Sequence, residues 1–456
     1  MIPWNRWYSF RSYMRSALWL APFFCVVAEM IIKRATEWLG NFGASRDWWV
    51  RGHAFLDLSV SSAQGLVDRI FSLNLSFLVF TFGSLLVAIQ VAGGQYTPRI
   101  IATTLLRDNV IRVVSGVFVF TMLWASRTLN LISGDHVPQF QVLLTGIFGM
   151  ISLIAFLLLI DYAARLLRPI SLVARIGNEG IKVIEAVYPV VLRNPAIKAA
   201  PARRKWRLPS WSSTAEKTSA PAVTARGDAS RIILHKGLSG IVLAVNLEEL
   251  IAQAQRCDCI VELGPQVGDF VAVDDPLFYI HGNADAIDER TLRSLVAFGP
   301  ERTIEQDPLF AFRVLVDIAL KALSPAINDP TTATLTIDQL HRLLRAVGLR
   351  SLSTAEFSDY TGQVRLIFRT PNWENFVHLS LREIRMCGAN SVQVVRRLYA
   401  MIDNLKRTLP EQRHAALQIE LDLLNKAVAR SFHFAEDLAL ARIPDSQGMG
   451  GSARAT

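Results

Sequence analysis

Four apolar runs in the N-terminal part of the chain predict membrane-spanning helices. Residues 142–160 and 70–92 carry no charged side chain, and each run is long enough to cross the hydrocarbon core of a bilayer. Residues 113–132 are interrupted only by Arg127 and small polar groups, and the shorter run 17–32 is flanked by tryptophans typical of a membrane interface. We therefore predict four transmembrane helices within a membrane domain that spans residues 1–192.

Lys and Arg in the short loops predict the orientation of these helices. Basic residues follow the second run (Arg99, Arg107) and the fourth run (Arg165, Arg168), whereas the loop at 133–141 has none. This asymmetry places the N- and C-termini in the cytoplasm. The loop at 33–69 argues against it, because it would lie outside and yet carries several Lys and Arg residues.

Polar side chains divide the second apolar run into two stripes. At about 100° per residue, one side of a helix carries Ser72, Ser76, Gly83 and Gln90, and the opposite side carries Asn74, Thr81 and Ala88. Small and polar residues support close helix packing, and the alternative is that they line an aqueous path. Two opposed stripes favour a helix that lies between two neighbours.

Arg127 is the one basic residue inside an apolar run. An intramembrane charge suggests function, but this position lies near the outer end of its helix, where a long side chain can reach the headgroups. We favour the second interpretation, in which Arg127 reaches the headgroups.

A basic, Pro- and Ser-rich segment at 193–230 separates the membrane domain from the rest of the chain. Its composition predicts a disordered linker. Arg203, Arg204, Lys205 and Arg207 within it contact anionic lipids or only satisfy the positive-inside rule. The net charge of +9 therefore gives no reason to expect a nucleic-acid partner.

The chain after residue 230 has the pattern of a cytoplasmic α+β domain. Short alternating runs with Gly and Pro turns predict a small β module at 231–282, with one helix inserted in it. A helical remainder follows at 283–441, with one short strand near 363–370 and a disordered tail at 442–456. The helices are expected at 285–298, 307–323, 330–347, 374–387, 391–408 and 411–441.

Few residues suggest catalytic or metal chemistry. Cys25, Cys257, Cys259 and Cys387 are the only cysteines, and neither they nor the eight His residues have metal-ligand spacing. P-loop, dinucleotide-binding, nucleophile-elbow and zinc-protease motifs are missing. We expect no cofactor and no metal, and an enzyme is the less favoured class.

The segment 303–333 holds the candidate ligand site. Asp307-Pro308 and Asp329-Pro330 each read as a capping residue followed by the first residue of a helix, which favours a structural role. Two helix N-termini beside hydroxyl and amide groups also suit a polar or anionic ligand. Arg313, Asp317 and Lys321 are spaced i, i+4, i+8 and so form a charged stripe on one face of the helix expected at 307–323. The candidate ligand-binding residues are Glu305, Arg313, Asp317, Lys321, Ser324, Asn328, Asp329, Thr331 and Thr332.

The same segment, TIEQDPLFAFRVLVDIALKALSPAINDPTTA, resembles the signature of the bacterial membrane-protein family catalogued as domain of unknown function 2254. The stretch VAIQVAGGQYTPRIIATTLLRD and the later GVFVF are similar to another part of that family. The resemblance implies a multi-pass inner-membrane protein with a cytoplasmic C-terminal domain, and it implies no activity. Gln95, Tyr96, Pro98 and Arg99 in the second stretch are candidates for coupling the membrane helices to the cytoplasmic domain.

These observations favour an oligomeric channel or transporter that its cytoplasmic domain regulates. Four helices per chain would enclose little, so a path for a solute requires a homo-oligomer. The alternative is a membrane-anchored sensor or scaffold without a transport path, and an enzyme that uses residues 305–332 ranks third. The transported or sensed ion or small molecule is not indicated.

Overall fold

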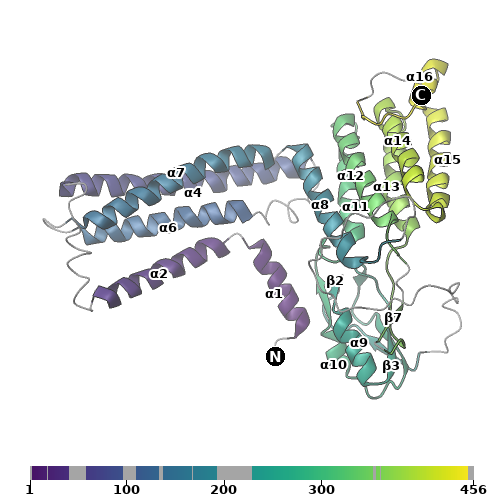
Figure 1. The fold of residues 1–456 in the computed structure, drawn as a ribbon, viewed down its shortest axis with the longest axis horizontal. Helices are drawn as coiled ribbons and strands as arrows, with labels where there is room; N and C mark the ends of the chain where they lie inside the picture. Colours follow the sequence, from purple (N-terminus) through teal and green to yellow (C-terminus); the bar gives the residue numbers. More distant parts are fainter. Residues whose placement is uncertain are drawn as a thin grey trace. The chain divides into compact units, whose positions relative to one another are not determined.

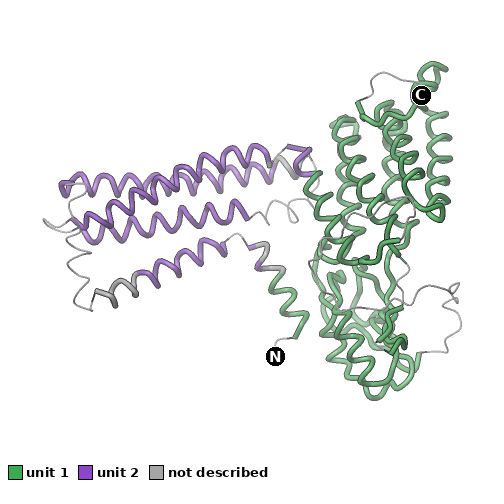
Figure 2. The backbone as a smooth tube through the Cα atoms, viewed as in Figure 1, with its two compact units in different colours: residues 1–12, 173–456 green, residues 13–172 purple. Residues whose placement is uncertain are grey.

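A computed structural model of the chain describes residues 3–17, 19–40, 58–95, 109–132, 137–166, 168–192, 229–352, 356–359 and 361–449. The chain divides into two compact units (Figure 2). One consists of residues 13–172. The other combines residues 1–12 with residues 173–456, so the two ends of the chain belong to the same unit.

The unit of residues 13–172 is a set of long apolar helices (Figure 1). Three of them are long and apolar enough to cross a membrane: Val60–Gln90 in α4 (Val60–Gln95), α6 (Asn109–Leu131) and Gln139–Arg165 in α7 (Gln139–Leu166). The first predicted span corresponds to a shorter apolar stretch, Leu20–Ile32, within α2 (Leu20–Gly40). The described residues thus contain three candidate spans and a fourth, shorter apolar helix.

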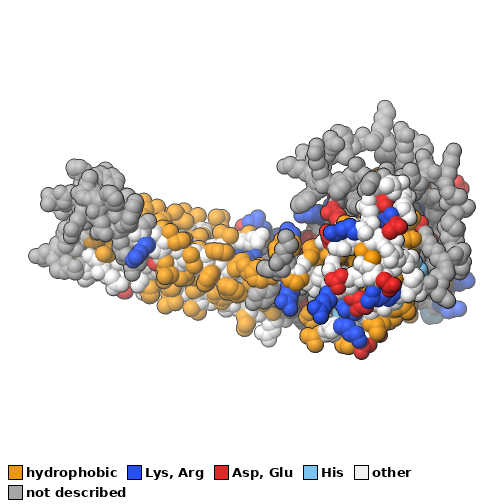
Figure 3. Space-filling model, turned by 90° about the horizontal axis from the view of Figure 1, so that it is seen from below, with side chains coloured by type: hydrophobic (Ala, Val, Ile, Leu, Met, Phe, Trp, Pro, Cys, Tyr) orange, Lys and Arg blue, Asp and Glu red, His pale blue; other side chains and the backbone are white. Residues whose placement is uncertain are grey.

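Small residues and aromatic rings hold these helices together. Phe77 of α4 stacks on Phe156 of α7 with ring centroids 4.2 Å apart. A Cβ atom added at Gly149 of α7 would lie 3.1 Å from the Ile70 side chain, so this glycine lets α7 approach α4 closely. On the face that Figure 3 shows, the visible side chains of the bundle are mostly hydrophobic, whereas charged side chains spread over the other unit.

The second unit contains two small β-sheets. The strands are β1 (Arg231–Leu234), β2 (Gly240–Val245), β3 (Cys259–Leu263), β4 (Phe270–Val271), β5 (Pro276–Gly282), β6 (Val296–Gly299), β7 (Glu356–Ser358) and β8 (Val364–Phe368). Five form a sheet in the order β1-β5-β3-β8-β7, and three form a sheet in the order β4-β2-β6. The alternating runs predicted the first five strands and β8, and the helix between β2 and β3 is α9 (Leu247–Arg256).

Two helix predictions in this unit need correction. The helix expected at 285–298 is only α10 (Glu289–Arg293), and the apolar residues that follow form β6. Val296 and Ala297 pair with β2 and are buried there, so tertiary burial decides their conformation. The helix expected at 411–441 is broken at Phe432 into α15 (His414–Ser431) and α16 (Ala435–Ala441), after a short 3-10 turn, η3 (Glu411–Arg413).

Helices form the rest of the second unit around α11 (Pro308–Ala322), almost all of whose side chains are buried. It packs against α12 (Pro330–Gly348) and α13 (Trp373–Gly388), and α14 (Val392–Thr408) follows. Residues 443–449, which composition assigns to a disordered tail, lie along α14, where Asp445 N–H donates to the Arg396 carbonyl at 3.1 Å.

Two segments lead from this unit into the apolar helices. The N-terminal α1 (Trp4–Ser16) precedes α2, and its Trp4 ring packs against Leu243, Ala244 and Ala297 of the β4-β2-β6 sheet. At the other end of the apolar helices, α8 (Pro169–Val187) follows α7 in the chain. Gly180 of α8 allows a close approach, because a Cβ atom there would lie 3.0 Å from the Ala311 side chain of α11.

Candidate functional site

The turn at residues 305–307 lies immediately before α11. Each of its three side chains accepts a hydrogen bond from a different helix or strand. Glu305 Oε2 accepts a hydrogen bond from the Tyr8 hydroxyl of α1 at 2.8 Å. Gln306 Oε1 accepts from the Val245 N–H of β2 at 3.0 Å. Asp307 caps α11, and its Oδ1 accepts from the Phe310 N–H at 3.1 Å. The turn therefore joins the N-terminal helix, a β-sheet and the helical part.

Asp307 is a buried carboxylate that packs closely against Gly268 and lies near Arg302. Its side chain is buried, and Gly268, with φ +94°, comes so close that a Cβ atom there would lie 2.5 Å from Asp307 Oδ2. Arg302 is also close to this point, and its Nε donates to the Gly268 carbonyl at 2.8 Å. Burial raises the pKa of Asp307 to about 6, although the Arg302 charge and the helix amides lower it and Asp269 raises it further.

Arg313 is the centre of an ion-pair cluster on α11. Its Nε donates to Asp317 Oδ1 at 2.7 Å, as the spacing on the helix predicted, and its Nη2 donates to Glu383 Oε2 of α13 at 3.0 Å. The hydrogen bond from Arg313 lowers the pKa of Glu383. Lys321, the third charge of the predicted stripe, is exposed on the last turn of α11. Sequence reasoning missed Glu383 because it is distant in the chain and no local spacing points to it.

The SPAINDPTTA segment forms the turn from α11 to α12 and is closed by its own hydrogen bonds. The N–H of Asn328 donates to the Ser324 carbonyl at 2.8 Å, and the N–H of Asp329 donates to the Ala322 carbonyl at 2.8 Å. Asn328 has a φ of +49°, a conformation that asparagine tolerates better than most residues. Asp329 caps α12 by accepting from the Thr332 N–H at 3.0 Å, with Pro330 as the first helical residue. The predicted cap at each helix start is confirmed.

The hydrogen bonds of this turn leave only part of the predicted ligand site free. Ser324 Oγ donates to the Lys321 carbonyl at 2.7 Å, and the hydroxyl of Thr332 donates to Asp329. Asn328 and Thr331 are exposed. Ligand binding at this turn stays a prediction, and the groups available for it are the side chains of Lys321, Asn328 and Thr331.

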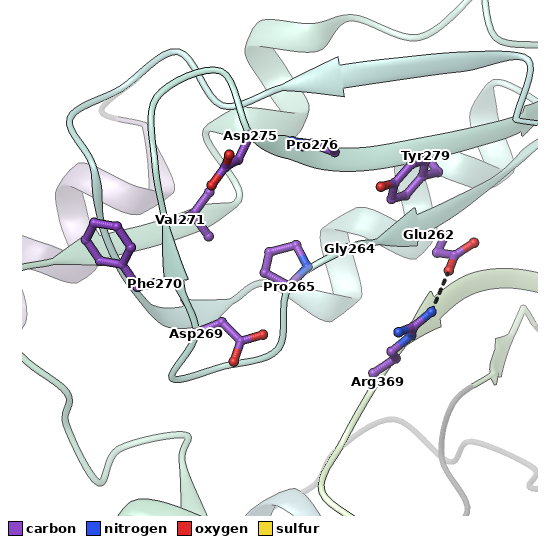
Figure 4. A pocket seen from close by; sticks show the side chains of 10 residues that line it. All are labelled: Glu262, Gly264, Pro265, Asp269, Phe270, Val271, Asp275, Pro276, Tyr279 and Arg369. Atoms are coloured by element: carbon purple, nitrogen blue, oxygen red, sulfur yellow. Dashed lines mark ion pairs between the residues drawn. The ribbon is translucent and has the colours of Figure 1, made fainter.

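A separate open cavity of about 390 Å³ lies on the β-sheet side, and sequence analysis did not anticipate it (Figure 4). Arg369 and Glu262 form an ion pair of 3.9 Å at one side of it, beside the Tyr279 ring. Near this cavity, the sequence indicated only two turns of the predicted β module, at Gly264-Pro265 and Gly268-Asp269. The residues that line it are Glu262, Gly264, Pro265, Asp269, Phe270, Val271, Asp275, Pro276, Tyr279 and Arg369.

The carboxylates of this cavity are suited to a positively charged ligand. Glu262, Asp269 and Asp275 outnumber the single guanidinium, although Asp269 and Asp275 each also accept one backbone N–H at 2.8 Å. Nowhere in the described parts of the chain do three or more His, Cys, Asp or Glu side chains gather to hold a metal ion. Asp269 of the cavity lining follows Gly268 in the chain, and Gly268 lies against Asp307.

The two polar stripes of α4 lie in different surroundings. Asn74 and Thr81 are buried in the bundle, where each side chain donates to a backbone carbonyl one turn earlier. Ser72, Ser76, Gly83 and Gln90 are all exposed.

Other predicted membrane positions are described only in part. The Arg127 guanidinium lies over the Trp124 ring, 5.6 Å from its centroid. Tyr96, Pro98, Arg99 and the basic cluster at 203–207 lie outside the described residues, as does the side chain of Gln95.

Comparison with known proteins places this architecture in a family. A family model described as "Predicted membrane protein (DUF2254)" matches residues 15–404. Uncharacterized proteins of Mycobacterium bovis and Mycobacterium tuberculosis are each 23% identical over 472 aligned positions, which cover 99% of this chain and 82% of theirs. No solved structure is significantly similar to the chain. Because the family model covers most of the sequence, the chain belongs to the DUF2254 family of predicted membrane proteins.

Proposed function

We propose that this protein is a multi-pass inner-membrane protein that forms an oligomeric channel or transporter regulated by its C-terminal domain. Two contacts support the proposed regulation. They are made by α1 and α8, the segments that lead into the membrane helices. Tyr8 of α1 bonds to Glu305, and Gly180 of α8 packs on Ala311, so both segments contact the start of α11 or the turn before it. A change at this turn would act on α1 and α8, the segments that adjoin α2 and α7 in the chain.

The same contacts support four membrane crossings. Residues 1–12 and 173–456 form one compact unit, and the Asn5 N–H donates to the Ser294 carbonyl at 3.0 Å. Segments of one compact unit lie on one side of a membrane, so the chain between them crosses an even number of times. Three long spans leave α2 as the fourth. The apolar stretch Leu20–Ile32 of α2 is about 20 Å long at 1.5 Å per residue, so a crossing by α2 would also use the rest of this 21-residue helix. The basic loops then favour cytoplasmic termini.

The packing between α6 and α7 favours a path between copies rather than through one chain. Thr121 and Ser152 hydrogen-bond across it at 2.9 Å, and Thr128 and Thr145 do so at 3.1 Å. Hydroxyl pairs of this kind join helices, so they fill the space that a path inside the chain would need. The solute path therefore requires a second copy.

Reconstitution of the full chain tests the proposal. Native-mass measurement should give an oligomer, and liposomes that contain the chain should pass potassium, sodium, chloride or protons in assays at pH 5.5 and 7.5. Tyr8→Phe should change the dependence of flux on pH, because it cuts the link between α1 and Glu305. Tyr399→Phe is the matched control, since it removes a hydroxyl hydrogen bond to Asn425 within the C-terminal unit. A monomer without flux under all conditions would favour the anchored sensor or scaffold.

A further inference from the structure

The exposed stripe of α4 is part of a longer seam with heptad spacing. Its residues recur at alternating steps of four and three, the spacing that brings two helices together along their length. Val79 and Leu86 within it are 65% and 69% exposed. The α4 seam consists of Gly65, Arg69, Ser72, Ser76, Val79, Gly83, Leu86 and Gln90.

On the opposite side of α4, residues also recur at steps of four and three, and this side packs against other helices of the same chain. Ala63, Val67, Ile70, Asn74, Phe77 and Thr81 are buried on the side that packs against α6 and α7. There, Gly149 of α7 meets Ile70, whereas Cβ atoms added at Gly65 and Gly83 of the seam would meet nothing within 4 Å. The apolar helix α2 packs against α6. Within the described parts of the chain, one face of α4 therefore has partners, whereas the seam residues are exposed or, at Gly65, half-buried.

We propose that the α4 seam binds the α4 seam of a second copy of this chain, in parallel, about a two-fold axis along the membrane normal. This inference rests on the proposed function, which requires self-association. Two copies with the same topology can be related only by such an axis, so each seam residue approaches its own equivalent. Serine and glycine at the closest positions allow the backbones to approach and bring the Ser72 and Ser76 hydroxyls near a neighbour.

Charge complementarity indicates that the partner of the α4 seam is a second copy of this chain. Asp68 and Arg69 are both exposed, and neither has an ion-pair or hydrogen-bond partner among the described residues. In a parallel helix pair, the residue just before a seam position lies beside that seam position of the partner. The two-fold axis therefore creates two equivalent pairs, each between Asp68 of one copy and Arg69 of the other. Each pair neutralises the charge of one arginine.

Disulfide cross-linking of the full chain in membranes tests the seam. Ser76→Cys and Gly83→Cys should each give a covalent dimer on mild oxidation, because a disulfide needs Cα atoms within about 7 Å. Phe80→Cys and Phe82→Cys are matched controls at similar depth. Both positions are exposed but lie beside the seam, so they should give at least tenfold less dimer. Equal cross-linking at all four positions, or none at the seam, would overturn the proposal.

A charge exchange provides a second test that does not depend on cysteine chemistry. Asp68→Arg alone and Arg69→Asp alone should each reduce the Gly83→Cys dimer several-fold, and the double exchange should restore it. Loss without restoration would refute the pairing. An oligomer in native-mass measurement without seam cross-links would reject the seam and leave the proposed function standing. Seam dimers without any flux would support the seam and reject the channel.

Discussion

The buried Asp307 makes a quantitative prediction for the stability of the C-terminal unit. Its pKa of about 6 lies above the value of about 3.9 for an exposed aspartate in the unfolded chain. The folded state therefore binds more protons between these values, and stability falls as the pH rises through this window. At 1.36 kcal/mol per pKa unit, the carboxylate costs about 3 kcal/mol of unfolding free energy once the pH exceeds 6.

Asp307→Asn should remove this cost and keep the helix cap, because asparagine caps helices as well as aspartate does. Relative to wild type, the variant should gain stability from pH 4.5 to 7.5, by up to about 3 kcal/mol. That corresponds to a rise of roughly 6–12 °C in the unfolding midpoint of a unit of this size. Tryptophan fluorescence of the full chain in detergent would follow the transition.

Asp329→Asn is the matched control. It changes the same kind of cap before a proline, at a position where the carboxylate keeps contact with solvent. It measures what the change from aspartate to asparagine costs a helix cap of this kind. If the difference between wild type and Asp307→Asn were flat from pH 4.5 to 7.5, burial of Asp307 would not control its ionisation and the reasoning would be refuted.

Three further outcomes follow from the same contacts, each measured as a shift in the unfolding midpoint of the full chain. Gly268→Ala should destabilise the C-terminal unit by at least about 1 kcal/mol more than Gly282→Ala does. Both glycines have a positive φ, but only at Gly268 would a Cβ atom collide, with Asp307; equal losses would contradict the crowding. Arg313→Lys should lower the free energy of unfolding by about 1 kcal/mol, because one ammonium cannot donate to Asp317 and Glu383 in the fork geometry of arginine. An unchanged midpoint would show that the cluster is solvated. Tyr8→Phe should cost about 1 kcal/mol through its bond to Glu305, and no loss would mean that this hydrogen bond does not stabilise the packing of α1.

Local patterns predicted most of the helices and strands because their signals lie within a few residues. The caps at Asp307 and Asp329 were readable from the aspartate-proline pairs, and the apolar runs marked the membrane helices. Residues 296–298 were predicted as the end of a helix, and only pairing with β2 makes them part of strand β6.

The candidate site was less predictable because its contacts join distant parts of the chain. Arg313 was expected to meet Asp317, four residues away, but Glu383 is 70 residues from Arg313. Glu305 bonds to Tyr8 across 297 residues, and no periodicity reports such a contact. The ligand interpretation of the SPAINDPTTA turn stays a prediction, and its hydrogen bonds reduce the groups that are free for it.

The packing of α1 on the β4-β2-β6 sheet has a consequence for assembly and for protein production. Trp4 and Tyr8 are synthesised long before Leu243, Ala244 and Ala297, so this apolar surface stays open until the helices between them have been made. A fragment that begins at residue 173 keeps α8 but would expose the same surface and tend to aggregate. Fusion of residues 3–12 to such a fragment through a flexible linker should restore a soluble unit, which would make the C-terminal half accessible to ligand-binding measurements in solution.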